Sequence, residues 1–139
     1  MAFPVSELRY HRKVLVIEDE NDTRLLLADH FDRLGYQVET AGDGNEGISL
    51  ALHLRPDVIV LDLEMPRLDG WDTVKLLRAY PTTAAIPVIA YTGTLEVGEA
   101  RALAGGCSVV IRKPFPPEDL ERVINDLLEE DEPEEFDAR

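Results

Sequence analysis

Residues 58–66 read Val-Ile-Val-Leu-Asp-Leu-Glu-Met-Pro, and this stretch indicates the fold more clearly than any other. Residues 58–61 form a short apolar run rich in β-branched side chains, which is typical of a strand covered on both faces of its sheet. The run leads into Asp62, and a loop containing Pro66 follows. Asp62 is therefore predicted to lie where a buried strand ends, at the edge of a sheet.

Four other segments of similar length are also predicted to form strands. They comprise residues 14–17, 37–41, 87–91 and 108–111. Helical patterns alternate with the strands, over about residues 21–34, 45–54, 71–80, 95–103 and 117–128. Asn21 or Asp22 is expected to cap the first helix. Because parallel neighbours need crossover connections, this alternation predicts an α/β fold, a five-stranded parallel sheet with five helices on both faces.

The composition is that of one soluble globular domain. The chain has 139 residues, of which 45% are hydrophobic and 30% charged, enough to bury a single core. No apolar run approaches the ~20 residues that a membrane-spanning helix requires, and residues 1–13 lack the apolar core of a secretory signal. The single cysteine, Cys107, agrees with a reducing compartment. We expect a cytoplasmic protein.

The charge balance is strongly acidic. The 28 acids exceed the 14 lysines and arginines, giving a net charge of -14, so we expect no direct contact with nucleic acid. Much of this charge lies in residues 129–139, which we interpret as a disordered acidic tail; docking on a basic partner is the alternative. The expected organisation is an N-terminal extension at 1–11 and a domain at 12–128, followed by that tail.

Chemically active residues follow four of the predicted strands, at the ends where parallel sheets bind ligands. They are Glu18, Asp19, Asp62, Thr92 and Lys113. Two carboxylates ~4 Å apart repel by about 4 kcal/mol at an effective dielectric of about 20, so crowded acids need a cation. Mg²⁺ fits, because it takes one or two carboxylates and also binds phosphate oxygens.

Asp62 could then act as a carboxylate nucleophile toward phosphorus. The ammonium of Lys113 would neutralise charge on the phosphoryl oxygens, and the hydroxyl of Thr92 would donate a hydrogen bond to them. The product would be an aspartyl phosphate. The alternative is that these acids, Glu18 above all, are ordinary loop residues that favour helix starts for dipole reasons.

Five motifs spread over residues 12–128 carry a family resemblance. They are Val14-Leu-Val-Ile-Glu-Asp-Glu20, Val60-Leu-Asp-Leu-Glu-Met-Pro66, Asp69-Gly70, Pro87-Val-Ile-Ala-Tyr-Thr92 and Lys113-Pro-Phe115. Together they resemble the receiver domains of two-component response regulators, in particular chemotaxis-regulator-like single-domain receivers. The resemblance implies a flavodoxin-like strand order 2-1-3-4-5 and a stand-alone response regulator, phosphorylated by a histidine kinase or a histidine phosphotransfer protein.

The resemblance also assigns a metal site for Mg²⁺ or Mn²⁺. Asp62 corresponds to the phosphoacceptor, and Asp19 to the carboxylate that binds the metal directly. Glu18 corresponds to the neighbouring acid that holds a metal-bound water. The backbone carbonyl of Glu64 would complete the protein ligands.

Thr92 and Lys113 correspond to the residues that contact the phosphoryl oxygens. The Lys113–Pro114 bond is expected to be cis, as in the family. Glu64 and Thr94 occupy positions that in the family help to set the lifetime of the aspartyl phosphate.

One position departs from the family pattern. Val110 stands where the family often has a tyrosine or phenylalanine that swings inward on phosphorylation. We interpret Val110 as an ordinary buried strand residue and suggest that Tyr91, beside Thr92, carries part of the signal instead. Trp71 is interpreted as a packing residue at the start of the third helix.

Three functions compete. The first is a phosphoacceptor, not an enzyme in the ordinary sense, that signals to an unknown protein target and allows a weak homodimer. The second is a phosphohydrolase, but Asp62-Leu63-Glu64 lacks the Asp-x-Asp of haloacid dehalogenases, and no lid-sized insertion is present. The third is a binding module independent of phosphorylation, which Val110 favours.

Overall fold

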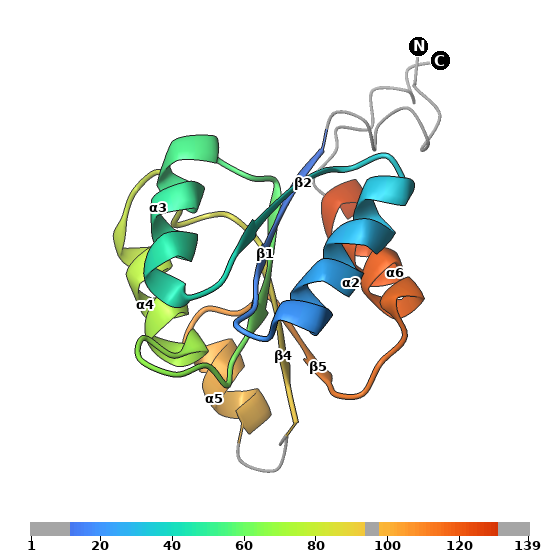
Figure 1. Cartoon of the computed structure of the whole chain (residues 1–139). Coiled ribbons are helices and arrows are strands. Elements are labelled where there is room, and N and C mark those ends of the chain that lie inside the picture. The colour runs from blue at the N-terminus through green and yellow to red at the C-terminus, as the bar shows by residue number, and fades with distance from the viewer. Residues whose placement is uncertain (1–11, 94–97, 131–139) are drawn as a thin grey trace.

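The computed structural model describes residues 12–93 and 98–130, and within them five strands alternate with five helices (Figure 1). The strands are β1 (Lys13–Ile17), β2 (Gln37–Ala41), β3 (Val58–Asp62), β4 (Val88–Thr92) and β5 (Val109–Arg112). The helices are α2 (Asn21–Arg33), α3 (Gly44–Leu54), α4 (Gly70–Ala79), α5 (Gly98–Ala104) and α6 (Pro117–Glu130). The predicted alternation is confirmed.

The strands form one parallel sheet in the order β2-β1-β3-β4-β5. Helices α2 and α6 cover one face, while α3, α4 and α5 cover the other (Figure 1). This three-layer arrangement and the strand order confirm the α/β fold and the order 2-1-3-4-5. All five strands point the same way, so their carboxyl ends lie along one edge, which we call the carboxyl edge.

Successive side chains of each central strand point to opposite faces of the sheet and belong to two separate hydrophobic cores. Leu15, Ile17, Ile59 and Leu61 belong to the core under α3, α4 and α5. The residues between them belong to the core under α2 and α6, together with Phe31, Tyr91, Leu120 and Ile124. Every residue of β3 and β4 is buried, as expected for strands in the middle of a covered sheet.

Some element boundaries differ from the prediction. Helix α2 has Glu20 at its N-cap, so the expectation that Asn21 or Asp22 caps it was wrong. The chain turns into the helix one residue earlier because the Glu20 N–H is already bonded to the Glu18 carboxylate. Helix α6 runs to Glu130 instead of ending near residue 128, so the expected tail begins with two helical residues. Our predictions for residues 1–11, 94–97 and 131–139 lie outside the described residues.

Arg78, near the end of α4, holds two loops against the sheet. Its guanidinium donates hydrogen bonds to backbone carbonyl groups only: Gly106 O at 3.0 and 2.7 Å, Ile86 O at 2.8 Å, Ala84 O at 3.1 Å and Thr83 O at 3.3 Å. Burial lowers the pKa of Arg78. One side chain thus ties the segments that lead into β4 and β5 to α4.

None of the helices in the described part of the chain combines the length and the apolar character that a membrane crossing demands.

Candidate functional site

Three carboxylates converge at the carboxyl edge. Glu18 and Asp19 directly follow β1, and Asp62 ends the adjacent strand β3, where Ile17 is in register with Leu61. One carboxylate oxygen from each acid lies within 4.8 Å of the others. Glu18 is 1% exposed and Asp62 is 2% exposed, whereas Asp19 is more open to solvent. Charges this close and this poorly hydrated require a cation.

Asp62 is held by two donors on the same oxygen. Its Oδ1 accepts the backbone N–H of Glu64 at 2.9 Å and lies 3.2 Å from Nζ of Lys113. Burial raises the pKa of Asp62, while the Glu64 amide and the Lys113 ammonium both oppose that rise. These two contacts therefore favour the ionised carboxylate that a nucleophile needs.

Glu18 is also held by two donors, one on each oxygen. Its Oε2 accepts the backbone N–H of Glu20 at 3.0 Å, and its Oε1 accepts the hydroxyl of Tyr91. Burial raises the pKa of Glu18 to about 7 against the lowering effect of these two hydrogen bonds, and the charge of Asp62 adds to the rise. Without a cation, Glu18 therefore holds a proton for a substantial fraction of the time near neutral pH.

Thr92 and Lys113 reach the same edge from β4 and β5. Thr92 is the last residue of β4 and is 1% exposed; it follows Tyr91, which is in register with Asp62. The Lys113 N–H donates to Thr92 O at 2.8 Å. The Lys113–Pro114 peptide bond is cis, which confirms that expectation.

The loop after Asp62 folds back on the strand end. The Gly70 N–H donates to Leu63 O at 3.1 Å, and a Cβ added to Gly70 would lie only 2.4 Å from Leu63 Cα and 2.5 Å from Asp62 O. The Glu64 side chain accepts the Gly93 N–H at 2.8 Å, which joins this loop to the end of β4. Only glycine fits at position 70 without moving the acid loop.

A family model described as the response regulator receiver domain matches residues 14–125. The chain belongs to this family. The match covers both acids after β1, the loop after β3 and the segment with Lys113, so it includes the whole of the site described above.

Curated relatives of this receiver domain are about twice its length. The probable transcriptional regulator ycf27 of Cyanophora paradoxa is 36% identical over 118 residues, which cover 84% of this chain and 48% of the relative. The response regulator MprA of Mycobacterium sp. (strain KMS) is 36% identical over 124 residues, which cover 88% of this chain and 53% of the relative. The chain thus spans about half the length of the curated relatives it matches.

Several solved structures share the fold of this chain over most of its length. The chemotaxis protein CheY4 of Vibrio cholerae superposes with a TM-score of 0.79 at 32% identity, covering 83% of this chain and 97% of that one. The receiver domain of the sensor histidine kinase PA1611 of Pseudomonas aeruginosa superposes with a TM-score of 0.77 at 28% identity, covering 83% and 95%. That structure has a magnesium ion coordinated in its active-site cleft.

In this receiver domain, Val110 and Tyr91 lie in different cores. Val110 was expected to be an ordinary buried strand residue; it lies on β5 and packs against the core under α3, α4 and α5, but it is only partly buried. Tyr91 is fully buried in the core under α2 and α6, where it reaches Glu18. Sequence reasoning singled out Tyr91 but missed this contact. Strand alternation would have placed the ring on that face, but not its hydroxyl on the acid.

Arg24 is a second residue that sequence reasoning missed. From the first turns of α2, its Nη1 donates to Glu18 O at 3.0 Å and to Asp19 O at 3.5 Å, and its Nη2 donates to Asn21 Oδ1 at 2.5 Å. Arg24 thus braces the backbone of the two acids after β1. No motif marked it, although a cation one turn into the helix after an acid pair is well placed to reach back.

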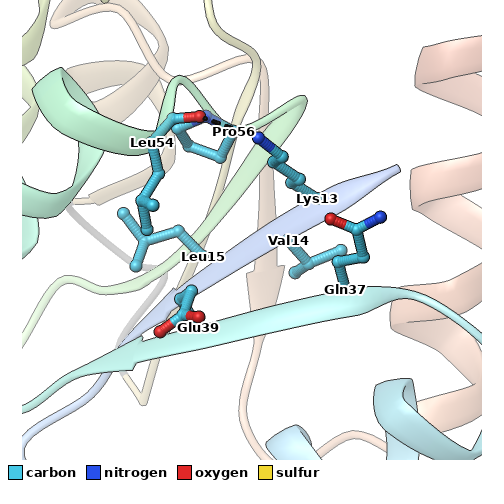
Figure 2. Close-up of a pocket in the computed structure, with 7 residues that line it drawn as sticks. All are labelled: Lys13, Val14, Leu15, Gln37, Glu39, Leu54 and Pro56. Carbon is cyan, nitrogen blue, oxygen red and sulfur yellow. Dashed lines mark hydrogen bonds between the residues drawn. The ribbon is translucent and has the colours of Figure 1, made fainter. Parts of the chain in front are cut away.

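A cavity of about 200 Å³ lies away from the acids, toward the amino ends of β1 and β2. Its lining is drawn in Figure 2: Lys13, Val14, Leu15, Gln37, Glu39, Leu54 and Pro56. The Lys13 ammonium donates a hydrogen bond to Leu54 O, at the end of α3, at 3.5 Å. It does not face the acid cluster. This cavity takes no part in the chemistry of the carboxyl edge.

Proposed function

We propose that this receiver domain accepts a phosphoryl group on Asp62 from a histidine kinase or a histidine phosphotransfer protein, in a reaction that requires Mg²⁺ or Mn²⁺. The observation that carries the proposal is the setting of Asp62. It is a buried carboxylate with two other acids within 4.8 Å and an ammonium at 3.2 Å. This combination suits transfer of a phosphoryl group to the Asp62 carboxylate better than a purely structural role.

The donor set fits a hard divalent cation. All the available groups are oxygens, and the three acids are too close to remain ionised together without a positive charge between them. We assign the carboxylates of Asp19 and Asp62 and the backbone carbonyl of Glu64 as protein ligands, with Glu18 acting through a bound water. When present, the metal supplies charge neutralisation to the phosphoryl oxygens. The magnesium ion in the PA1611 receiver domain supports this assignment.

Three side chains carry out the remaining parts of the proposed phosphoryl transfer. The Asp62 carboxylate forms a P–O bond as the P–N bond of the phosphohistidine breaks and its electron pair goes to the imidazole nitrogen. Lys113 and the hydroxyl of Thr92 stabilise charge on the transferred group. Slow hydrolysis of the aspartyl phosphate would return the domain to its starting state, so Asp62 is an acceptor and not a turnover catalyst.

The phosphorylated domain then signals through protein contacts. The net charge of -14 on the whole chain disfavours direct contact with nucleic acid, although several relatives carry names of transcriptional regulators. The expectation of a stand-alone domain stays a prediction, as does a weak homodimer. Val110 supports a second candidate, a binding module that works without phosphorylation, because it replaces the expected switch residue.

Incubation with acetyl phosphate and MgCl₂, followed by intact-mass measurement, tests the proposal. We expect wild type to gain one phosphate, and Asp62→Ala to gain none; EDTA should abolish the gain. Asp126→Asn, an exposed acid on α6, is the matched control and should behave as wild type. An unmodified wild type would favour the binding module, and multiple turnover on a phosphomonoester such as p-nitrophenyl phosphate would favour a phosphohydrolase.

A further inference from the structure

The side chain of Tyr91 reaches past one intervening strand, and its hydroxyl donates a hydrogen bond to Glu18. Tyr91 lies on β4 and Glu18 follows β1, and β3 runs between them. The two residues are 73 positions apart in the chain, and both are buried, at 0% and 1% exposure. A hydrogen bond of this kind ties the middle of the sheet to the acid cluster.

This bond completes the restraint on the Glu18 carboxylate. The Glu20 N–H holds Oε2 at 3.0 Å, and the hydroxyl of Tyr91 holds Oε1. A single donor would leave the carboxylate free to rotate about its last bond, but two donors on different oxygens set its plane. The orientation of the Glu18 carboxylate relative to Asp19 and Asp62 is therefore fixed.

The tyrosine ring is itself fixed. It packs edge-on against Phe115, with ring centroids 5.3 Å apart and planes at 72°, and Nζ of Lys113 lies 5.0 Å from its centroid. Rigid packing of this kind sets the hydroxyl in place before any ligand arrives. The same ring thus contacts residues on both sides of the cis Lys113–Pro114 bond and one of the acids.

We propose that Tyr91 is a positioning residue that holds the Glu18 carboxylate in the orientation needed by the metal site, an inference that rests on the proposed function. Groups that hydrogen-bond to the acids and imidazoles around a metal orient them, and their loss typically costs about 10–100-fold in metal affinity or activity. Because Glu18 acts on the metal through water in our assignment, the effect belongs at the lower end of that range.

Calorimetric titration with MgCl₂ tests the proposal on Tyr91→Phe, which removes the hydroxyl and keeps the ring. We expect Mg²⁺ affinity to fall about tenfold. Tyr36→Phe is the matched control. Tyr36 is buried in the same core, and its hydroxyl donates to Asn125 Oδ1 at 3.1 Å, away from the acids. Its Mg²⁺ affinity should stay within about twofold of wild type.

A double-mutant cycle shows whether Tyr91 acts through Glu18. If it does, adding Tyr91→Phe to Glu18→Gln should change the remaining Mg²⁺ affinity less than twofold, roughly within the error of such cycles. An equal loss in both backgrounds, or a loss in Tyr36→Phe as large as in Tyr91→Phe, would mean a packing effect and overturn the inference. Unchanged Mg²⁺ binding in Tyr91→Phe overturns the inference alone, whereas a wild type that binds no Mg²⁺ overturns the proposed function as well.

Discussion

The ammonium of Lys113 lies 3.2 Å from Oδ1 of Asp62, the oxygen that also accepts the Glu64 N–H at 2.9 Å. Lys113 directly follows β5 and Asp62 ends β3, and β4 lies between these two strands. Both donors contact Oδ1, and neither contacts Oδ2, so the two oxygens of the carboxylate have different surroundings. In the proposed reaction, Oδ2 would therefore be the oxygen that attacks phosphorus.

Replacing Lys113 by methionine should slow phosphorylation by acetyl phosphate about tenfold or more, because a donor that stabilises developing charge is lost. Mg²⁺ binding should persist, since our proposed set of metal ligands does not include Lys113. Rates come from intact-mass time courses at fixed MgCl₂. Lys75→Met, an exposed lysine on α4, is the control and should react at the wild-type rate. A normal rate in Lys113→Met would contradict its role.

Stability should depend on pH through Glu18. Burial raises its pKa from the usual 4.5 to about 7, so the folded, metal-free protein binds a proton between these values when the unfolded chain does not. The free energy of unfolding should therefore fall as pH rises through this window, by about 3 kcal/mol in full. The raised pKa of Asp62 acts in the same direction.

Urea unfolding in EDTA near pH 5.5 and near pH 7.5 measures this dependence. Glu18→Gln has no carboxylate to titrate and should show a flatter profile. If the wild type and this variant gave parallel profiles, the proton on Glu18 would not be the cause.

Gly70→Ala should be destabilising by about 2 kcal/mol or more, because its Cβ would collide with backbone atoms of Leu63 and Asp62 that cannot rotate away. Mg²⁺ affinity should drop as well, since the acid loop must shift. Gly42→Ala is the matched control, because its Cβ would meet its nearest neighbour, Arg24 Nη1, at an ordinary 3.5 Å. Chemical denaturation of both variants should separate them clearly; equal stability would refute the close approach at Gly70.

Arg78→Lys should cost about 2 kcal/mol of unfolding free energy, because a lysine ammonium cannot span the four carbonyl groups that the guanidinium fork reaches. Arg33→Lys is the comparison. Arg33 pairs with Asp29 at 3.0 Å, but the side chains are 78% and 57% exposed, so its loss should stay within about 0.5 kcal/mol. Similar losses in the two variants would argue against the role of the carbonyl contacts.

The elements and the acid cluster were predictable because both follow from local rules. The apolar run before Asp62 marked a covered strand, and parallel strands bring their carboxyl ends together whatever their side chains are. The contact between Tyr91 and Glu18 was not predictable in this way. It depends on which face a side chain takes, on the width of one intervening strand and on the packing of Phe115, none of which a local pattern contains.

The start of α2 shows the same limit on a smaller scale. Asn21 and Asp22 are better capping residues than Glu20, but the Glu20 N–H is engaged by the buried Glu18 carboxylate, and the helix has Glu20 at its N-cap. The role of Arg24 was not predictable either, because its contacts with the backbone of Glu18 and Asp19 depend on the folded path of the chain.

The partners of Arg78 have a consequence for how this domain can change over evolutionary time. Its guanidinium recognises carbonyl groups, which every amino acid provides, so the residues at 83, 84 and 86 can be exchanged without removing an acceptor. Gly106 is the exception, because a Cβ there would lie 2.9 Å from Arg78 Cγ. The contacts of Arg78 therefore leave the side chain at position 84 open to change, while burial still restricts positions 83 and 86.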